Sequence, residues 1–419
     1  MLPGLGFPSP SLYFHPRTHN STSAGPKFKQ LCAQLTTKHS FLISRHLESI
    51  TSHKSKVTFA LLQIFRGWAA ILVILVHASG ISSSQHGSLF LGDFFSMGNA
   101  GVDFFFVLSG FLIFYIHQKD FGKPSKLATY LRKRTLRIFP IYWIVTLILI
   151  PVYFIIPAYG QGDETKLSVI LGSLFLLPME RAPILVAGWS LIHELLFYFI
   201  FALLIGIRGR WVWALAGMWV LGLLYTLANS TTQVFQSAFP NLTPLQHLIW
   251  WPQNLEFVFG AGAAAYIASP TLPKPSRRAC LWILPLSLVT FLFIGSLVPT
   301  IHSLQIASHI VIYGLLSVLI IISSTQLDLI GGLGPKISGR RLFRTGQNLG
   351  DASYSIYLIH GPALSVLFKL AGKTRLFDHV STQLVTAAII LLTLGVGCLF
   401  HSLVERRLLN ACRRWTSPA

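Results

Sequence analysis

Acidic residues are scarce in this 419-residue sequence, where 13 Asp and Glu stand against 33 Lys and Arg, for a net charge of +20. Charged residues of both signs make up only 11% of the chain, against 53% hydrophobic residues, and the mean hydropathy is +0.61. Soluble domains carry about 25% charged residues, so this scarcity excludes a soluble globular protein and indicates a polytopic membrane protein. The basic residues lie in short clusters between apolar runs, which argues against nucleic acid as a partner.

Cysteine is also sparse. The four cysteines, Cys32, Cys280, Cys398 and Cys412, show no CxxC or metal-ligand spacing, so we expect no disulfide framework and no metal site. Residues 1–56 contain a single acid, Glu48, and lack any long apolar run. We expect this segment to be a weakly ordered cytoplasmic extension, although a transit peptide or too early a start codon would leave the same composition.

Long apolar runs, in contrast, are abundant from residue 57 onward. We predict an all-α membrane domain at 57–408 and a cytoplasmic tail at 409–419, because about ten runs approach the twenty residues that a bilayer core of about 30 Å requires. The predicted spans are 57–80, 94–117, 138–157, 187–207, 211–229, 253–269, 279–299, 306–325, 349–370 and 381–403. A shorter run at 167–177 predicts a re-entrant or interfacial helix. The basic connections alternate with uncharged ones, which places both termini in the cytoplasm.

The first span carries two ionisable side chains, Arg66 and His77. Eleven residues of α-helix return to within roughly 20° of the starting direction, so the two side chains share one face, about 16 Å apart. Ala70 and Val73 lie between them. Ionisable residues inside a span indicate a functional site, and we interpret this stripe as the lining of a path. The alternatives are that Arg66 snorkels to the interface and that His77 only bonds a carbonyl.

Three further titratable groups fall in later spans at a depth similar to that of His77. They are Asp103 in GVDFFFVLSG, Glu194 in WSLIHELLFYF and His360 in SYSIYLIHG. The second and fourth spans run inward from the outer side, which puts both acids in the outer half. If these helix faces meet, the four groups form a buried acid–base cluster.

A basic run, YLRKRTLRIFPIYW, precedes the third span at the opposite surface. Arg134 and Arg137 are three residues apart and face the same way if the run is helical. Guanidinium groups suit phosphate, so we predict that these two and Arg132 bind a polyphosphate ligand, with Tyr142 as additional polar lining. Ordinary juxtamembrane binding of anionic lipid is the alternative.

Five blocks of the sequence together resemble the acyltransferase 3 family of integral membrane O-acyltransferases. RGWAAILVILVH resembles the R-x10-H signature of the family, and GVDFFFVLSGFLI, RTLR with IFPIYW, WSLIHELLFYF and GDASYSIYLIH resemble its later blocks in the right order over about residues 60–408. The resemblance implies an enzyme of the bacterial inner membrane that moves an acyl group, usually acetyl, from cytoplasmic acyl-CoA to a hydroxyl of a sugar or surface glycan. Arg66 and His77 match the essential pair of the family, Arg134 and Arg137 its RxxR motif, and Glu194 its block acid.

These residue types fit such a reaction. Basic side chains at the cytoplasmic face would hold the phosphates of CoA, and a neutral His77 would take the proton of the acceptor hydroxyl. Glu194 or Asp103 would orient the imidazole, and Arg66 would hold the thioester oxygen or the arm of the donor. A covalent acyl-His77 intermediate is the alternative path. The alternative class is a secondary transporter with an intramembrane charged pathway, but we find no symmetry between the two halves.

Overall fold

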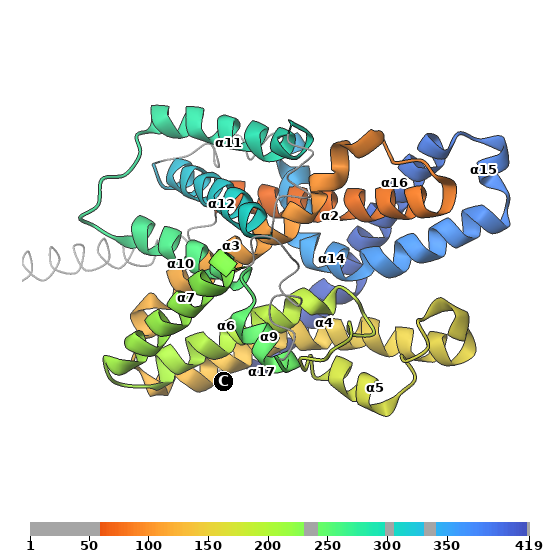
Figure 1. Cartoon of the computed structure of the whole chain (residues 1–419). Coiled ribbons are helices and arrows are strands. Elements are labelled where there is room, and N and C mark those ends of the chain that lie inside the picture. The colour runs from red at the N-terminus through yellow and green to blue at the C-terminus, as the bar shows by residue number, and fades with distance from the viewer. Residues whose placement is uncertain (1–58, 230–241, 298–305, 331–340, 417–419) are drawn as a thin grey trace, which may run out of the picture. The chain divides into compact units, whose positions relative to one another are not determined.

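The structure of the protein is a computed structural model that describes residues 59–229, 242–297, 306–330 and 341–416. Throughout these ranges the regular elements are helices, and no strand occurs (Figure 1). The predicted extension at 1–56 lies outside the described residues.

Each predicted span corresponds to a helix. The long helices are α2 (Ala60–His86), α3 (Ala100–His117), α4 (Leu127–Ile155), α6 (Gly188–Gly206), α7 (Trp211–Asn229), α10 (Asn254–Ala268), α11 (Arg277–Leu297), α12 (Ile306–Leu329), α14 (Arg341–Lys373) and α16 (Thr382–Phe400). Within the described ranges, nine helices are long and apolar enough to cross a membrane. The exception to the predicted ten is α10, whose 15 residues span only about 22 Å.

Shorter helices connect these spans. The predicted interfacial helix is present as α5 (Leu167–Leu174), and α9 (Pro244–Trp250) precedes α10. A 3-10 segment at Gly92–Asn99 leads into α3, and α15 (Leu376–His379) precedes α16. After α16, a π-helical turn at His401–Glu405 continues into α17 (Arg406–Thr416), so the predicted tail begins within a helix.

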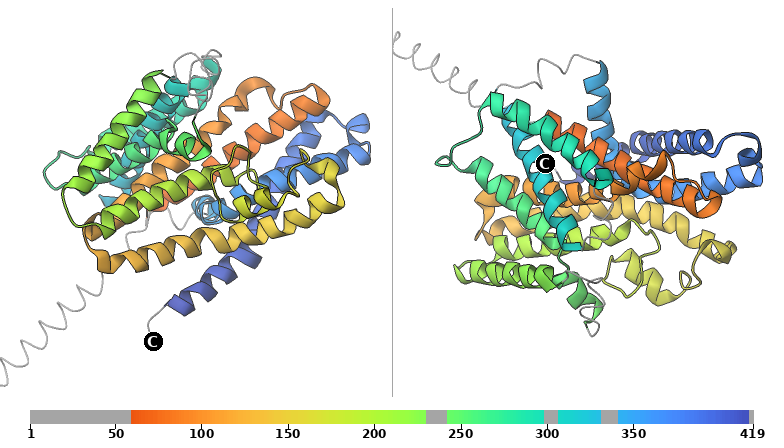
Figure 2. Two further views of the ribbon diagram at one scale, coloured as in Figure 1. Left: turned by 60° about the horizontal axis from the view of Figure 1, so that its bottom comes forward. Right: turned by 45° about the horizontal axis from the view of Figure 1, so that its top comes forward.

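Two glycines set the register between α2 and α14, which lie side by side in both views of Figure 2. A Cβ on Gly67 would meet Leu349 and Gly350, and a Cβ on Gly350 would come within 1.8 Å of the Gln63 carbonyl oxygen. The two backbones are therefore in direct contact and run in parallel. Ten residues beyond Gly67 and Gly350, the same register brings His77 level with His360.

The helices α3 and α10 are also packed backbone to backbone. A Cβ on Gly110 would come within 2.0 Å of the Phe257 carbonyl oxygen, and a Cβ on Gly260 within 1.8 Å of the Val107 carbonyl oxygen. Phe257 then stacks on Phe106 of α3, with ring centroids 4.5 Å apart, and on a phenylalanine of α6. Small residues at helix contacts permit this close approach in a membrane, where the hydrophobic effect does not press helices together.

Replacing Gly350 by valine should therefore destabilise the bundle by about 3 kcal/mol or more, because the added side chain overlaps the backbone of α2. Thermal unfolding of the purified protein in detergent measures this loss. Gly361→Ala on the same helix is the matched control, since no neighbouring atom lies within 4 Å of its added Cβ. Equal melting temperatures for the two variants would contradict the inferred backbone contact.

Candidate active site

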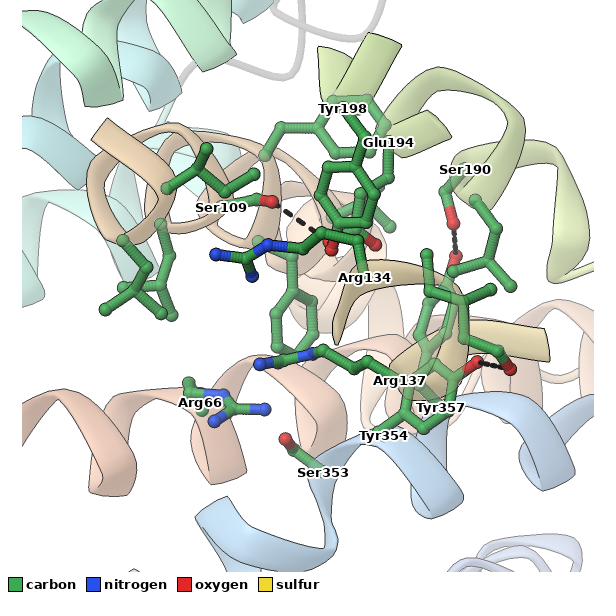
Figure 3. A pocket seen from close by; sticks show the side chains of 18 of the residues that line it. Arg66, Ser109, Arg134, Arg137, Ser190, Glu194, Tyr198, Ser353, Tyr354 and Tyr357 are labelled. Carbon is green, nitrogen blue, oxygen red and sulfur yellow. Dashed lines mark hydrogen bonds between the residues drawn. The ribbon is translucent and has the colours of Figure 1, made fainter. Parts of the chain in front are cut away.

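A cavity of about 120 Å³ lies where α2, α3, α4, α6 and α14 meet, and Figure 3 shows the side chains that line it. Its α3 wall is a stripe with helical spacing that includes Val102, Phe106, Ser109 and Ile113. The remaining wall is mostly polar, with Ile138 and Leu191 as its apolar side chains. Its polar members are Arg66, Arg134, Arg137, Ser190, Glu194, Tyr198, Ser353, Tyr354 and Tyr357.

Three guanidinium groups point into this cavity from two helices (Figure 3). Arg134 and Arg137 face the same way, as predicted, because α4 is already helical from Leu127. The Arg134 guanidinium lies over the ring of Tyr198, 5.4 Å from its centroid, and its buried Nε has no hydrogen-bond partner among the described residues. Arg66 comes from α2. Three cations inside an apolar bundle form a site suited to an anionic ligand.

Glu194 is the acidic side chain of this cavity. Its carboxylate accepts hydrogen bonds from Ser109 Oγ at 3.0 Å and from the Tyr198 hydroxyl at 2.5 Å. The sequence reasoning missed both donors. A signal was present in the spacing of Ser190, Glu194 and Tyr198, which lie four residues apart on one face of α6. The carboxylate gives the three guanidinium groups a fixed counter-charge.

A second cavity, of about 400 Å³, shares Arg66, Arg137 and Tyr354 with the first. Its further polar lining is Lys133, Asp351, Glu405 and Cys412. The two shared arginines therefore border both spaces. This arrangement places a wider basic chamber next to a narrower inner one.

Glu405, which lies outside the motifs of the sequence analysis, also lines the second cavity. Its side chain is buried and accepts hydrogen bonds from Ser355 Oγ at 2.5 Å and from His401 Nδ1 at 2.7 Å. It ends the π-helical turn at His401–Glu405, and such turns occur frequently at functional sites. Glu405 thus belongs to the wall of the second cavity, held by two side-chain donors.

His77 and His360 form a pair, with ring centroids 5.0 Å apart and ring planes at 69°. Each imidazole directs Nδ1 at a backbone carbonyl, His77 at Val73 O (2.8 Å) and His360 at Tyr357 O (2.5 Å). A carbonyl only accepts hydrogen bonds, so Nδ1 carries the proton in both neutral rings, and each Nε2 keeps its lone pair. A hydrogen bond to a carbonyl was, in the sequence analysis, the alternative to a catalytic role for His77. In the structure this hydrogen bond also fixes the tautomer that a base needs, because it leaves the Nε2 lone pair free.

The four titratable groups do not all come together in this structure, where only His77 and His360 meet. Glu194 contacts Ser109, in the middle of α3, and lies with the arginines instead. Asp103 is one helical step away from the cavity-lining stripe of α3, and faces α10 and α12. The position of a residue along a predicted span gives its depth in the membrane. It does not say which neighbouring helix its side chain faces.

The inner cavity also stops short of the histidine pair. Tyr357 lines the cavity, with its hydroxyl 2.6 Å from Ser190 Oγ, and its ring centroid lies 5.6 Å from that of His360. His77 has an exposed ring and is not among the residues that line either cavity. Neither cavity therefore extends to His77 in this structure, and Tyr357 lies between the inner cavity and His360.

Two of the predicted ligand-binding residues have other positions. Arg132 is exposed and lines neither cavity. Tyr142 is fully buried, and its hydroxyl donates to the Ser173 carbonyl oxygen at 2.8 Å, while Trp143 Nε1 donates to the Leu174 carbonyl oxygen at 2.8 Å. These carbonyls belong to the last turn of α5, which has no intrahelical donors for them. Tyr142 therefore anchors α5.

Tyr142→Phe should lower the free energy of unfolding by about 1 kcal/mol, because it removes a buried hydrogen bond to the Ser173 carbonyl oxygen, which keeps the Leu176 N–H as donor. The KM for the donor substrate should stay unchanged. Denaturation in detergent and substrate titration of the same preparation measure the two quantities. A raised KM at unchanged stability would instead support the predicted role of Tyr142 in ligand binding.

No group of three or more His, Cys, Asp or Glu side chains in the described part of the chain has an arrangement that could hold a metal ion.

Comparison with known proteins agrees with a group-transfer site. Residues 59–402 match the family described as "Acyltransferase domain". The exopolysaccharide production protein ExoZ of Rhizobium meliloti (strain 1021) is 31% identical over 328 residues, which cover 77% of this chain and 93% of ExoZ. The acyltransferase MdmB of Streptomyces mycarofaciens is 24% identical over 374 residues, covering 83% of this chain and 90% of MdmB. No solved structure matches. Because the family match spans most of the chain, this protein belongs to the acyltransferase 3 family of membrane enzymes.

Proposed function

We propose that the protein transfers an acyl group, in particular acetyl, from acyl-CoA on the cytoplasmic side to a hydroxyl of a sugar in a surface polysaccharide. The observation that carries this proposal is the sequence of sites along α2 and α14. Arg66 borders the two cavities with Arg137, and eleven residues later His77 pairs with His360. An anion-binding chamber thus stands at one end of the helix pair and a pair of bases further along.

The donor fits the chambers by charge. Lys133, Arg137 and Arg66 line the wider cavity, and its net charge stays positive with Asp351 and Glu405 included. Guanidinium groups form paired, charge-assisted hydrogen bonds with phosphate oxygens, so this chamber would receive the phosphate-bearing end of acyl-CoA. The narrower cavity, whose α3 wall is mostly apolar, would receive the thin acyl-bearing arm. Arg134 and Glu194 would bond its amide groups.

Distance separates the roles of Arg66 and His77. Eleven residues of α-helix place them about 16 Å apart along α2. The Arg66 guanidinium is directed away from His77, because its Nη1 donates to Gln63 Oε1 at 3.0 Å one turn earlier, so in this structure the two side chains do not reach the same carbonyl group. We therefore assign Arg66 to the donor and not to the thioester oxygen at the point of transfer.

The transfer step uses the free lone pair of His77 Nε2. As the acceptor oxygen attacks the thioester carbonyl carbon, its proton passes to Nε2, the C–O bond forms and the C–S bond breaks. The thiolate leaves, and the imidazolium returns the proton to it directly or through water. His360, whose Nε2 is also unprotonated, would be a further carrier for this same proton on its way from His77 to the thiolate. Because neither cavity extends to His77, the thioester reaches it only if the intervening side chains move.

His77 would alternatively accept the acyl group itself before passing it to the acceptor. Labelled donor mixed with enzyme in the absence of acceptor separates the two paths. Label retained on the denatured protein, and lost in His77→Ala, would favour the covalent path.

The acceptor class and the location follow from similarity and from charge. The name of ExoZ connects that protein with exopolysaccharide production. The positive-inside pattern supports a cytoplasmic position for both termini, and for the basic chamber near the start of α4, in the inner membrane. Acceptor hydroxyls would then meet His77 from the outer side.

The test supplies purified protein in detergent with acetyl-CoA and polysaccharide from the host, and follows free thiol together with polysaccharide mass. We expect thiol release that depends on the acceptor, with a gain of one acetyl group per modified sugar. Hydrolysis without acceptor dependence, or no thiol release by correctly folded protein, would contradict the proposed function.

A further inference from the structure

Asp103 belongs to a second polar cluster on the face of α3 opposite to the catalytic cavity. It is 1% exposed, and Glu256 of α10 is 0% exposed. The two carboxyl groups lie within hydrogen-bonding reach of each other. His309 Nδ1 of α12 is 3.3 Å from Asp103 Oδ2, and Gln253 Nε2 donates to Asp103 Oδ1 at 3.3 Å. Three helices therefore enclose two adjacent acids.

The acids lack the donors that two carboxylates would need. Both oxygens of Glu256 are buried and have no hydrogen-bond partner among the described residues. The polar groups that face the pair are Gln253, which immediately precedes α10, and His309 and Tyr313 from α12. None of these is Lys or Arg. Two adjacent negative charges without a fixed cation are strongly unfavourable in a dry interior.

A proton removes this conflict, because a protonated carboxyl is the donor that the other carboxylate lacks. His309 is the member of the cluster that reaches the surface, with 21% of its side chain exposed. Its Nδ1 faces Asp103, which leaves Nε2 to exchange protons with water. The geometry thus combines a buried acceptor pair with a titratable group that connects it to solvent.

We propose that Asp103 and Glu256 form a proton-binding site in which the two carboxyl groups share one proton and His309 delivers and removes it. On loading, His309 takes a proton from water at Nε2 and gives the one on Nδ1 to Asp103 Oδ2, which returns the imidazole to neutrality. On unloading, the same transfers run backward. No other reactant is needed.

The shared proton also stabilises a helix contact. Asp103 lies two turns before Gly110 on α3, and Glu256 lies one turn before Gly260 on α10, where the two backbones touch. With both carboxyls ionised, their repulsion would push α10 away from α3 at this contact. The site is separate from the catalytic cavity, which the other face of α3 lines.

Infrared difference spectroscopy of the full-length protein in detergent tests the proposal. The wild type at neutral pH should show the C=O stretch of a protonated, buried carboxyl, and this band should shift in D₂O. Glu256→Gln should abolish or shift the band, since it removes one of the two carboxyl groups that share the proton. Glu405→Gln, which removes a buried carboxyl from another site, is the matched control and should retain the band.

His309→Gln provides a second measurement. It should slow the exchange of the carboxyl proton for deuterium by about 10²-fold, as expected when a positioned proton carrier is lost. A wild type without the band would overturn the proposal and would instead favour a bound metal cation that keeps both carboxylates ionised. A band that persists unchanged in Glu256→Gln would also overturn it. If Glu256→Gln fails to fold, Asp103→Asn replaces it in this test. A band at the wild-type frequency in Asp103→Asn would then overturn the proposal.

Discussion

Replacing His77 by alanine is expected to lower kcat for acyl transfer by about 10²- to 10⁴-fold, the usual contribution of a positioned general base. The KM for acyl-CoA should change little, because His77 lines neither cavity that would hold the donor. The measurement is acceptor-dependent thiol release over a range of donor concentrations. His360→Gln should cause a smaller loss, since it removes the neighbour of the base and not the base itself.

His86→Ala is the matched control for this loss. His86 lies on the same helix, where its ring stacks on Phe377 with centroids 3.7 Å apart, away from both cavities. We expect its kcat to stay near the wild-type value. A comparable drop in both variants would show that the effect comes from damage to α2, and wild-type kcat in His77→Ala would remove His77 from the reaction.

Arg137→Ala is expected to raise the KM for acyl-CoA by about 30-fold or more, with a smaller effect on kcat. Arg137 borders both cavities, and losing a charged hydrogen-bond partner of a buried ligand group costs about 2 kcal/mol or more. Arg137→Lys keeps the charge but not the planar pair of donors, so we expect an intermediate KM. Substrate titration in detergent measures both variants.

Arg132→Ala gives the matched control, five residues earlier on the same helix. Arg132 is exposed and lines neither cavity, so its removal should leave the KM for acyl-CoA near the wild-type value. Equal increases in KM for Arg132→Ala and Arg137→Ala would mean that the donor responds only to the general positive charge of this surface. The inferred role of the two cavities would then be wrong.

Properties that depend on local sequence were predictable. Segments of about twenty apolar residues have to be helices in a membrane, since every backbone polar group must be satisfied within the span. Arg134 and Arg137 face the same way because three residues of helix return to nearly the same side. The short apolar run at 167–177 likewise corresponds to α5.

Properties that depend on neighbouring helices were not predictable from one sequence. From the sequence, Asp103 and Glu194 were expected to lie beside His77. In the structure Asp103 lies next to Glu256 and His309. Glu194 accepts hydrogen bonds from Ser109 and Tyr198. Hydropathy gives the depth of a residue but does not say which helix stands against its face. The same holds for Tyr142, which was placed in the ligand site from the sequence. Its hydrogen bond to α5 depends on the packing of α5 against α4, which the sequence does not reveal.

The sequence by itself therefore determined that the chain is a helical membrane protein, and its ordered blocks indicated the acyltransferase family. Only the tertiary structure decided which polar residues act together. The reason is that side-chain partners are selected by backbone contacts such as that of Gly350 with Gln63, which fix the register of α14 on α2 and thereby bring His360 to His77.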